Sequence, residues 1–277
     1  MEIWQAVILG IVEGLTEFLP VSSTGHLTIA EKLMGFDINS ADITAFTAII
    51  QLGAILATII YFRQDIWRLL RAWVVGLIDA TKRTQDYKFG WAVILGSLPI
   101  GVVGLVFKDS IETTLRSLWL VAFALIGWSA VMWLADHRAT QERHEKDITL
   151  KDTLIVGLVQ CLALIPGVSR SGATMSAGLL RGLDRVAVTR LSFFLAIPAL
   201  TAAGLLQLAD HHSQIASGVG WTATAVATIV SFVVAYASVA WLLRFIAKHT
   251  YKVFIIYRVV IGFVLIGLLL TGTISAT

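Results

Sequence analysis

Apolar residues form long uninterrupted runs in this chain. A helix needs about 20 apolar residues to cross the hydrocarbon core of a bilayer. Six runs reach about this length, at 43–62, 89–107, 118–135, 191–209, 220–243 and 253–271. The first five contain no charged residue, and the sixth contains only Arg258. The pattern therefore predicts an all-α polytopic membrane protein with six transmembrane helices.

Two further apolar regions are broken by polar and helix-disrupting residues. Region 3–33 is interrupted at residues 13–26, and region 153–180 is interrupted at residues 166–174. Proline and glycine disfavour a helix interior, and serine and threonine compete for its backbone hydrogen bonds. Each region is too short for two full spans, so we predict a re-entrant helix–loop–helix hairpin in each. Its turn would lie inside the membrane, surrounded by protein or a water-filled cavity.

Basic residues set the expected orientation. In this arrangement four loops face one side and hold 16 of the 21 Lys and Arg residues, whereas the loops on the other side hold two. These four loops are 63–88, 136–152, 181–190 and 244–252. Because cytoplasmic loops carry the excess of positive charge in membrane proteins, we expect these loops in the cytoplasm and both termini outside.

Composition excludes other classes of protein. Only 14% of the residues are charged and 57% are hydrophobic, with a mean hydropathy of +0.82. A soluble domain carries about 25% charged residues, so a soluble enzyme, a disordered chain and a secreted disulfide scaffold are excluded. The net charge of +3 comes from the cytoplasmic loops. The expected partners are therefore membrane lipids and no nucleic acid.

The two broken regions also resemble each other. At a constant offset of 147 residues, segment 10–13 aligns with 157–160 and segment 22–25 with 169–172. Each half then holds one hairpin and three spans, and because three is odd the second half crosses the membrane upside down. We predict one integral membrane domain built as an inverted-topology repeat, which is a transporter architecture. The domain is 1–277, with halves of about 1–135 and 153–277 joined by the charged cytoplasmic loop 136–152.

The first hairpin places two acidic residues in an apolar segment. Glu13 and Glu17 are four residues apart, so they share one helix face. Two buried carboxylates repel each other and require a cation, a proton or an arginine between them. This pattern indicates a divalent-metal or proton-handling pair, unless both carboxylates lie in water at the membrane surface.

A run of hydroxyl groups follows the carboxylates. Ser22, Ser23 and Thr24 supply hydroxyls, Gly25 lets the backbone approach a ligand closely, and His26 comes next. A serine beside a histidine and a carboxylate is typical of an activated nucleophile. The alternative is a polar loop that only caps the next helix.

The second hairpin carries an arginine at the equivalent turn. Charged side chains are costly inside a membrane. Hydroxyls and small residues surround Arg170 at the predicted start of a helix, namely Ser169, Ser171, Gly172 and Thr174. Arginine, hydroxyls and a helix N-terminus together bind phosphate oxygens. Arg170 is also suited to pair with a glutamate of the first hairpin, and the two roles are compatible.

Four weaker candidates lie elsewhere in the chain. Gln51 and Gln160 lie within apolar segments and are expected to support the site. Arg258 is close to a helix end, so we expect its charged group to snorkel to the membrane surface. The Asp-His-His run at 210–212 resembles a metal-ligand cluster, but a short external loop is the favoured interpretation.

Two motifs resemble those of a known family. Segment 13–26, EGLTEFLPVSSTGH, and segment 166–174, PGVSRSGAT, are similar to the signature motifs of the bacterial undecaprenyl pyrophosphate phosphatases, the bacitracin-resistance family. Both motifs are contiguous and in the family's order. The resemblance implies hydrolysis of undecaprenyl diphosphate to undecaprenyl phosphate and inorganic phosphate. This reaction recycles the lipid carrier for peptidoglycan and other envelope polymers and confers bacitracin resistance.

The resemblance also implies the setting of the reaction. It indicates a multi-pass protein of the bacterial cytoplasmic (inner) membrane, with an active site open to the periplasmic side. The substrate would be a polyprenyl diphosphate lipid, and the cofactor would be Mg²⁺ or Ca²⁺. A homodimer is left open, as are the preferred metal and the isoprenoid length. The attacking group is left open between Ser23, His26 and water.

Residues and resemblance together give three groups of site residues. The catalytic group is Glu17, Ser23, His26 and Arg170, and the metal group is Glu13 and Glu17. The diphosphate-binding group is Ser22, Thr24, Gly25, Ser169, Arg170, Ser171, Gly172 and Thr174. The competing function is a transporter or flippase for a polyprenyl phosphate, with or without hydrolysis. A nucleophile, a base and a cation together favour the enzyme, because transport alone does not require them.

Overall fold

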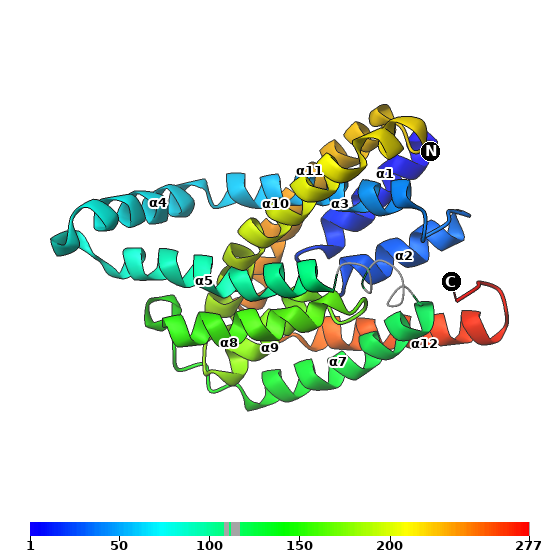
Figure 1. The fold of residues 1–277 in the computed structure, drawn as a ribbon. Helices are drawn as coiled ribbons and strands as arrows, with labels where there is room; N and C mark the ends of the chain where they lie inside the picture. Colours follow the sequence, from blue (N-terminus) through cyan, green and yellow to red (C-terminus); the bar gives the residue numbers. More distant parts are fainter. Residues whose placement is uncertain (108–110, 112–116, 277) are drawn as a thin grey trace.

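The computed structural model describes residues 1–107, 111 and 117–276, which form helices joined by turns (Figure 1). The long helices are α1 (Ile3–Thr16), α2 (Ser23–Leu33), α3 (Ala41–Tyr61), α4 (Arg63–Ile78), α5 (Gln85–Val106), α7 (Leu118–Arg138), α8 (Leu150–Gln160), α9 (Arg170–Leu180), α10 (Arg185–Ser217), α11 (Trp221–Ile246) and α12 (Lys252–Leu270). Short 3-10 helices lie at Ala80–Lys82, Glu145–Asp147 and Cys161–Leu164. The described residues form no β-strand.

Six of the described helices are long and apolar enough to cross a membrane, namely α3, α5, α7, α10, α11 and α12. Each coincides with one predicted span, so the prediction of an all-α, multi-pass membrane protein is confirmed. Both ends of the chain lie at one end of the molecule, and α4 with the start of α5 extends at the other (Figure 1). The amphipathic α4 packs along α5.

Helix α10 is longer than the predicted span. The external loop expected at 210–212 is wrong, because the helix continues to Ser217 with a kink at His211 (φ −125°, ψ 19°). Beyond the kink, Ile215 is fully buried in a cluster with apolar residues of α1, α3 and α11. This packing keeps the chain helical after its apolar run has ended.

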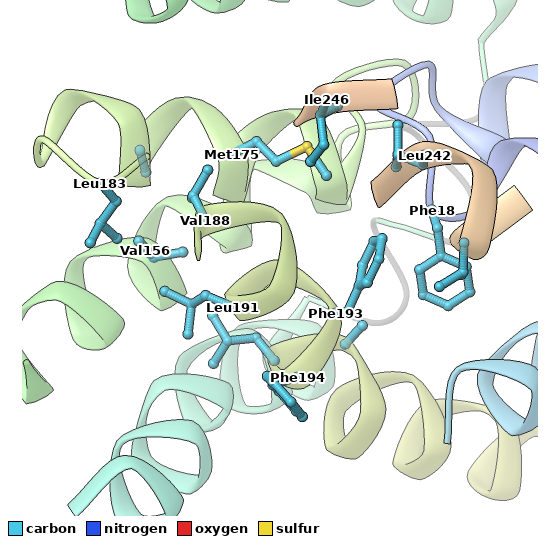
Figure 2. Packing of buried hydrophobic residues seen from close by; sticks show 14 of the residues in the cluster. Phe18, Val156, Met175, Leu183, Val188, Leu191, Phe193, Phe194, Leu242 and Ile246 are labelled. Carbon is cyan, nitrogen blue, oxygen red and sulfur yellow. The ribbon is translucent and has the colours of Figure 1, made fainter. Parts of the chain in front are cut away.

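The largest hydrophobic cluster lies next to the turn that follows α1 (Figure 2). Phe18 and Phe193 are fully buried in it, and their rings meet edge to face with centroids 5.1 Å apart. Such a pair adds about 0.5–1.5 kcal/mol beyond the burial of its area. Phe18 follows Glu17 in the sequence, so this packing anchors the chain where α1 ends.

Two glycines let the short helices α1 and α8 approach their neighbours closely. Gly10 of α1 lies against the backbone of α11 at Ala227, and Gly157 of α8 lies against the backbone of α5 at Gly96. A side chain at either position would overlap a carbonyl oxygen. Small residues permit this close backbone contact between membrane helices. Gly10 and Gly157 are aligned residues of the two halves, and each allows its helix to contact the backbone of a neighbouring helix.

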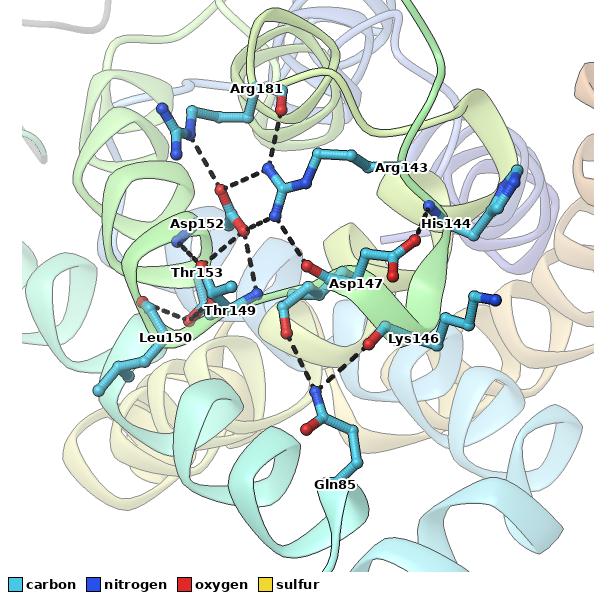
Figure 3. A network of polar contacts seen from close by, with 11 residues as sticks. Gln85, Arg143, His144, Lys146, Asp147, Thr149, Leu150, Asp152, Thr153 and Arg181 are labelled. Atoms are coloured by element: carbon cyan, nitrogen blue, oxygen red, sulfur yellow. Dashed lines mark hydrogen bonds and ion pairs between the residues drawn. The ribbon is translucent and has the colours of Figure 1, made fainter.

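A network of ion pairs ties the loop before α8 to α8 and α9 (Figure 3). The Asp152 carboxylate is fully buried and pairs with Arg143 and, at 2.9 Å, with Arg181. Burial by itself would raise the pKa of the Asp152 carboxyl. Hydrogen bonds from Arg143, Thr149 and Arg181 outweigh burial and hold that pKa well below its usual value.

We expect Asp152→Asn to lower the free energy of unfolding by about 3 kcal/mol, because one amide cannot balance two arginines. The depressed pKa means that the carboxylate stabilises the fold above the usual aspartate pKa of about 3.9. This stabilisation is lost as the pH falls through the lower pKa of the folded state. Thermal unfolding in detergent across this pH range measures the effect. The difference in melting temperature between the variant and the parent protein should become smaller below about pH 4.

Glu142 provides the control for this experiment, because it is exposed in the same loop. Glu142→Gln should unfold at the temperature of the parent protein. If Asp152→Asn also melted with the parent at neutral pH, the network would contribute nothing to stability.

Candidate active site

The turns before α2 and α9 have the same unusual backbone. Ser22 and Ser169 have positive φ angles of 76° and 78°, which are uncommon for residues other than glycine. Each serine is the N-cap of the helix that follows, and its hydroxyl accepts a hydrogen bond from the N–H of Gly25 or Gly172. A helix cap, the alternative interpretation of the first run of hydroxyls, is therefore present at Ser22, and Ser169 forms the same cap in the second turn. A strained conformation is held at the same point in each turn.

Glu17 is the point where the two broken regions meet. Its buried carboxylate accepts hydrogen bonds at Oε2 from Ser23 Oγ, at 2.6 Å, and from Gln51 Nε2, at 3.1 Å. Its Oε1 pairs with Arg170 Nη2 at 3.4 Å. The predicted pairing of Arg170 with a glutamate is confirmed, and Gln51 supports the site from α3.

Within the described residues, Arg170 does not use all of its hydrogen-bond donors. Its Nη1 donates to the Ser192 carbonyl at 2.9 Å, and its guanidinium carbon lies 5.5 Å from the centre of the Phe18 ring. Its buried Nε has no hydrogen-bond partner in the described part of the chain. A buried donor without an acceptor is costly. An anionic oxygen bound beside Arg170 would remove this cost.

A cavity of about 230 Å³ lies between the two turns. Its polar lining is Glu17, Ser22, Ser23, Thr24, Thr28, Glu31, Thr47, Gln51, Ser169 and Arg170. Its apolar lining is Ile38, Ile100, Ile111, Val121, Ala163, Leu164, Pro166 and Leu200. The same cavity therefore offers hydroxyls, charges and an apolar wall.

Glu31 is a cavity residue that sequence reasoning missed. It is buried and accepts a hydrogen bond from Thr47 at 2.9 Å. The signal that could have found it is spacing, because Thr24, Thr28 and Glu31 recur every three or four residues along one face of α2.

Four predicted binding residues are absent from the described lining of the cavity, namely Gly25, Ser171, Gly172 and Thr174. Ser171 Oγ donates to the Leu19 carbonyl at 2.8 Å, which ties the second turn to the first. Thr174 Oγ1 donates to the Ser192 hydroxyl at 2.7 Å, and Ser192 also contacts Arg170. Ser171 and Thr174 therefore support the backbone and side chains that line the cavity. Their contact with a diphosphate stays a prediction, as does that of Gly25 and Gly172.

His26 lies against α12 and is also absent from the described lining. Its Nδ1 is 2.8 Å from the Ser22 carbonyl, its Nε2 is 2.8 Å from the Tyr257 hydroxyl, and the two rings stack 5.5 Å apart. A carbonyl oxygen only accepts, so Nδ1 carries the proton and Nε2 accepts from the tyrosine O–H. In this arrangement, His26 holds the backbone of the Ser22 turn.

The sequence is similar to one family of proteins along most of its length. The family model of the bacitracin resistance protein BacA matches residues 6–264. This chain belongs to the BacA family.

Relatives from three bacteria match the whole or nearly the whole chain. It is 67% identical to undecaprenyl-diphosphatase 3 of Frankia casuarinae, over 100% of both chains. It is 56% identical to the undecaprenyl-diphosphatase of Cutibacterium acnes, over 98% of this chain and 99% of that protein. It is 55% identical to undecaprenyl-diphosphatase 1 of Streptomyces avermitilis, over 99% of both chains.

The carboxylates of this BacA-family chain suit a divalent cation. Glu13 is fully buried, and neither of its oxygens has a hydrogen-bond donor in the described residues. Mg²⁺ and Ca²⁺ prefer oxygen ligands, and Mg²⁺ is usually held by one or two carboxylates together with substrate phosphates. The described chain contains no group of three or more His, Cys, Asp or Glu residues placed to hold a metal. Glu17 lines the cavity, whereas Glu13 is absent from its described lining, so a metal ion held by both carboxylates stays a prediction.

Two further polar residues of the BacA-family chain differ from expectation. The prediction that Arg258 snorkels to the surface is wrong, because it is fully buried on α12. It donates instead to oxygens of α7 and of both turns, so it needs no contact with water. Gln160 is also buried, but neither its Nε2 nor its Oε1 has a partner in the described chain. No contact supports its predicted role in the site.

Proposed function

We propose that this chain hydrolyses undecaprenyl diphosphate to undecaprenyl phosphate and inorganic phosphate in the bacterial cytoplasmic membrane, which recycles the carrier for envelope polymers. The observation that carries the proposal is the arrangement of three residues in the cavity. Glu17 accepts a hydrogen bond from the Ser23 hydroxyl at 2.6 Å and lies beside Arg170. A base, a nucleophile and a cation in one place provide what phosphoryl transfer requires. The relatives described above are named undecaprenyl-diphosphatases, which supports the choice of substrate.

The chemistry begins at the hydrogen bond between Ser23 and Glu17. Ser23 Oγ attacks the terminal phosphorus, its proton passes to Glu17, and the bond from that phosphorus to the bridging oxygen breaks. Undecaprenyl phosphate leaves. Water then attacks that phosphorus, the bond from phosphorus to Ser23 Oγ breaks, and Glu17 returns the proton to Oγ. Both hydrogens of the water leave with the inorganic phosphate. Arg170 balances the charge of the phosphoryl group throughout.

A second route uses water in place of Ser23 as the nucleophile, with Glu17 as its base. In both routes a divalent metal, when bound by Glu13 and Glu17, supplies positive charge to the diphosphate. The apolar lining of the cavity, which includes Ile100, Leu164 and Leu200, offers a wall for the first isoprenoid units.

Release of phosphate from undecaprenyl diphosphate by the purified protein in detergent tests the function. We expect release by the parent protein, and we expect Ser23→Ala to lower kcat about a thousandfold with little change in KM. Acid quenching with substrate labelled at its terminal phosphate should trap phosphoserine. Ser213→Ala, at an exposed position of α10, is the control.

The two possible failures have different meanings. No metal-supported release from the parent protein would contradict the proposed function. Ser23→Ala with more than about a tenth of the parent kcat would leave the function intact and assign the attack to water.

Two substitutions of His26 separate its possible roles. Asparagine places an amide N–H near Nδ1 and can still donate to the Ser22 carbonyl, whereas glutamine places its amide near Nε2. We expect His26→Asn to keep kcat within about tenfold of the parent value and His26→Gln to lower kcat about a hundredfold. The Ser22 turn depends on the N–H that donates to the Ser22 carbonyl, and only asparagine retains it. If both variants were equally inactive and the pH profile of kcat/KM lost its acidic or its basic limb, His26 would instead be favoured as an acid or base.

The proposed architecture is an inverted repeat with two re-entrant hairpins. The bounds of α2 and α9 differ by 147 residues at both ends, and Ser22 and Ser169 cap them in the same way. Helix α1 packs on α11, and the aligned α8 packs on α5. These matching elements support the proposal.

The cavity is proposed to open on the periplasmic side. Its lining includes Ile38 and Ile111, which lie in segments predicted to be outside. Many ion pairs, such as those of Arg185 with Asp136 and of Arg190 with Asp65, lie in loops predicted to be cytoplasmic. These pairs hold the opposite end of the molecule together.

Cysteine labelling tests the orientation of the two hairpins. Leu33 at the end of α2 and Leu180 at the end of α9 are 61% and 52% exposed. In a Cys161→Ser background, we expect a membrane-impermeant maleimide to label Leu33→Cys in intact spheroplasts. Leu180→Cys should react only after the membrane is opened, because α2 and α9 would enter from opposite sides. Labelling of both cysteines from one side would contradict the inverted repeat.

A further inference from the structure

Arg258 is a buried cation without a carboxylate partner. Its side chain is fully buried on α12, and no acidic residue of the described chain pairs with it. It donates from Nε to the Ser129 hydroxyl at 3.1 Å, from Nη1 to the Pro20 carbonyl at 3.3 Å and from Nη2 to the Gly167 carbonyl at 2.9 Å. Burying a charge against neutral acceptors alone is costly in a membrane protein. This cost requires a compensating role.

The two carbonyls that Arg258 binds are equivalent positions of the two turns. Pro20 and Gly167 differ by the same 147 residues that relate the two halves. Each carbonyl lies two residues before the serine with a positive φ, Ser22 or Ser169. One planar guanidinium therefore contacts the same point of both turns at once, through two nitrogens held at a fixed spacing, whereas a lysine has to reach both carbonyls from a single nitrogen.

These turns carry the reacting groups on both sides of the cavity. Pro20 lies three residues from Glu17 and three from Ser23, and Gly167 lies three residues from Arg170. Glu17 and Arg170, which are 3.4 Å apart, thus each lie three residues along the chain from one of the two carbonyls. We propose that Arg258 is a positioning residue that sets the register of the two turns and thereby assembles the active site. This inference rests on the proposed hydrolysis for its kinetic effect only.

Arg258→Lys and Arg258→Met test the proposal, with Ser129→Ala as the matched control that removes only the Nε acceptor. We expect Arg258→Lys to purify as a folded protein, to keep KM within about threefold and to lower kcat about a hundredfold, since a displacement of about 1 Å has that effect on a reaction. Ser129→Ala should keep the kcat of the parent protein within about twofold.

A distance measurement tests the same proposal without any substrate. Spin labels at Leu33→Cys and Leu180→Cys, in a Cys161→Ser background, report the separation of α2 and α9. The parent protein and Ser129→Ala should give one narrow distance distribution. Arg258→Lys and Arg258→Met should give a broadened or shifted one.

The outcomes separate this inference from the proposed function. If the parent protein releases no phosphate but the Arg258 variants broaden the distance distribution, the function fails and the positioning role stands. If the Arg258 variants lose thermal stability but keep the parent kcat and a narrow distribution, Arg258 is only structural and the proposal is overturned. Should Arg258→Met not fold, Arg258→Lys retains the charge and decides between these outcomes.

Discussion

Substitution of Glu17 by glutamine is expected to lower kcat for phosphate release about a thousandfold, because the amide cannot accept the proton of the nucleophile. Glu17 is the acceptor for Ser23 Oγ at 2.6 Å and the ion-pair partner of Arg170 at 3.4 Å. Glutamine has nearly the same shape, so the α1 turn and its Phe18 anchor should persist. The loss should therefore appear in kcat more than in KM.

Steady-state phosphate release by purified protein in detergent measures this effect. Glu142→Gln makes the same chemical change at an exposed loop position and should retain the parent kcat. More than about a tenth of the parent kcat in Glu17→Gln would remove Glu17 as the base. The assignment would then have to pass to another acceptor in the cavity.

Substitution of Gly157 by alanine is expected to lower the stability of the fold by about 3 kcal/mol, because the added methyl group overlaps the carbonyl oxygen of Gly96. The obstructing atom belongs to the backbone of α5, which cannot rotate away as a side chain can. For a protein of this size, the loss corresponds to a melting temperature lower by about 5 °C. Size-exclusion chromatography after a temperature series measures it.

Gly101 provides the matched control on α5. Outside its own helix, no atom of the described residues lies within 4 Å of the position that its Cβ would take. Gly101→Ala should therefore be no less stable than the parent protein, because it also removes the flexibility of glycine from a helix. A melting temperature of Gly157→Ala equal to that of Gly101→Ala would show that α5 and α8 do not depend on this close approach.

The sequence predicts the membrane helices well because their signal is local. Length and apolarity suffice for α3, α5, α7, α11 and α12, whose runs end where charged or polar residues begin. The end of α10 is missed because residues 210–217 are mostly polar, whereas the structure continues the helix and buries Ile215 in a cluster with other helices. The composition of residues 210–217 does not reveal this contact with other helices.

The site is predictable where unusual residues occur and unpredictable where tertiary contacts decide. Glu17 and Arg170 stand out because charges are rare in apolar segments, and the structure brings them together. The direction of His26 depends on Tyr257, and the burial of Arg258 depends on carbonyls far away in the chain. Spacing along one helix cannot reveal partners that another helix supplies.

The lengths of α2 and α9 determine how far the substrate must travel. Each helix has 11 residues, which extend about 16 Å at 1.5 Å per residue. In the proposed inverted repeat, the two N-termini would meet about halfway through a hydrocarbon layer of about 30 Å. The diphosphate must therefore leave the headgroup region and shed much of its hydration before it reacts. Water would reach the diphosphate at that depth only through the cavity, which favours the hydroxyl already beside Glu17 as the attacking group.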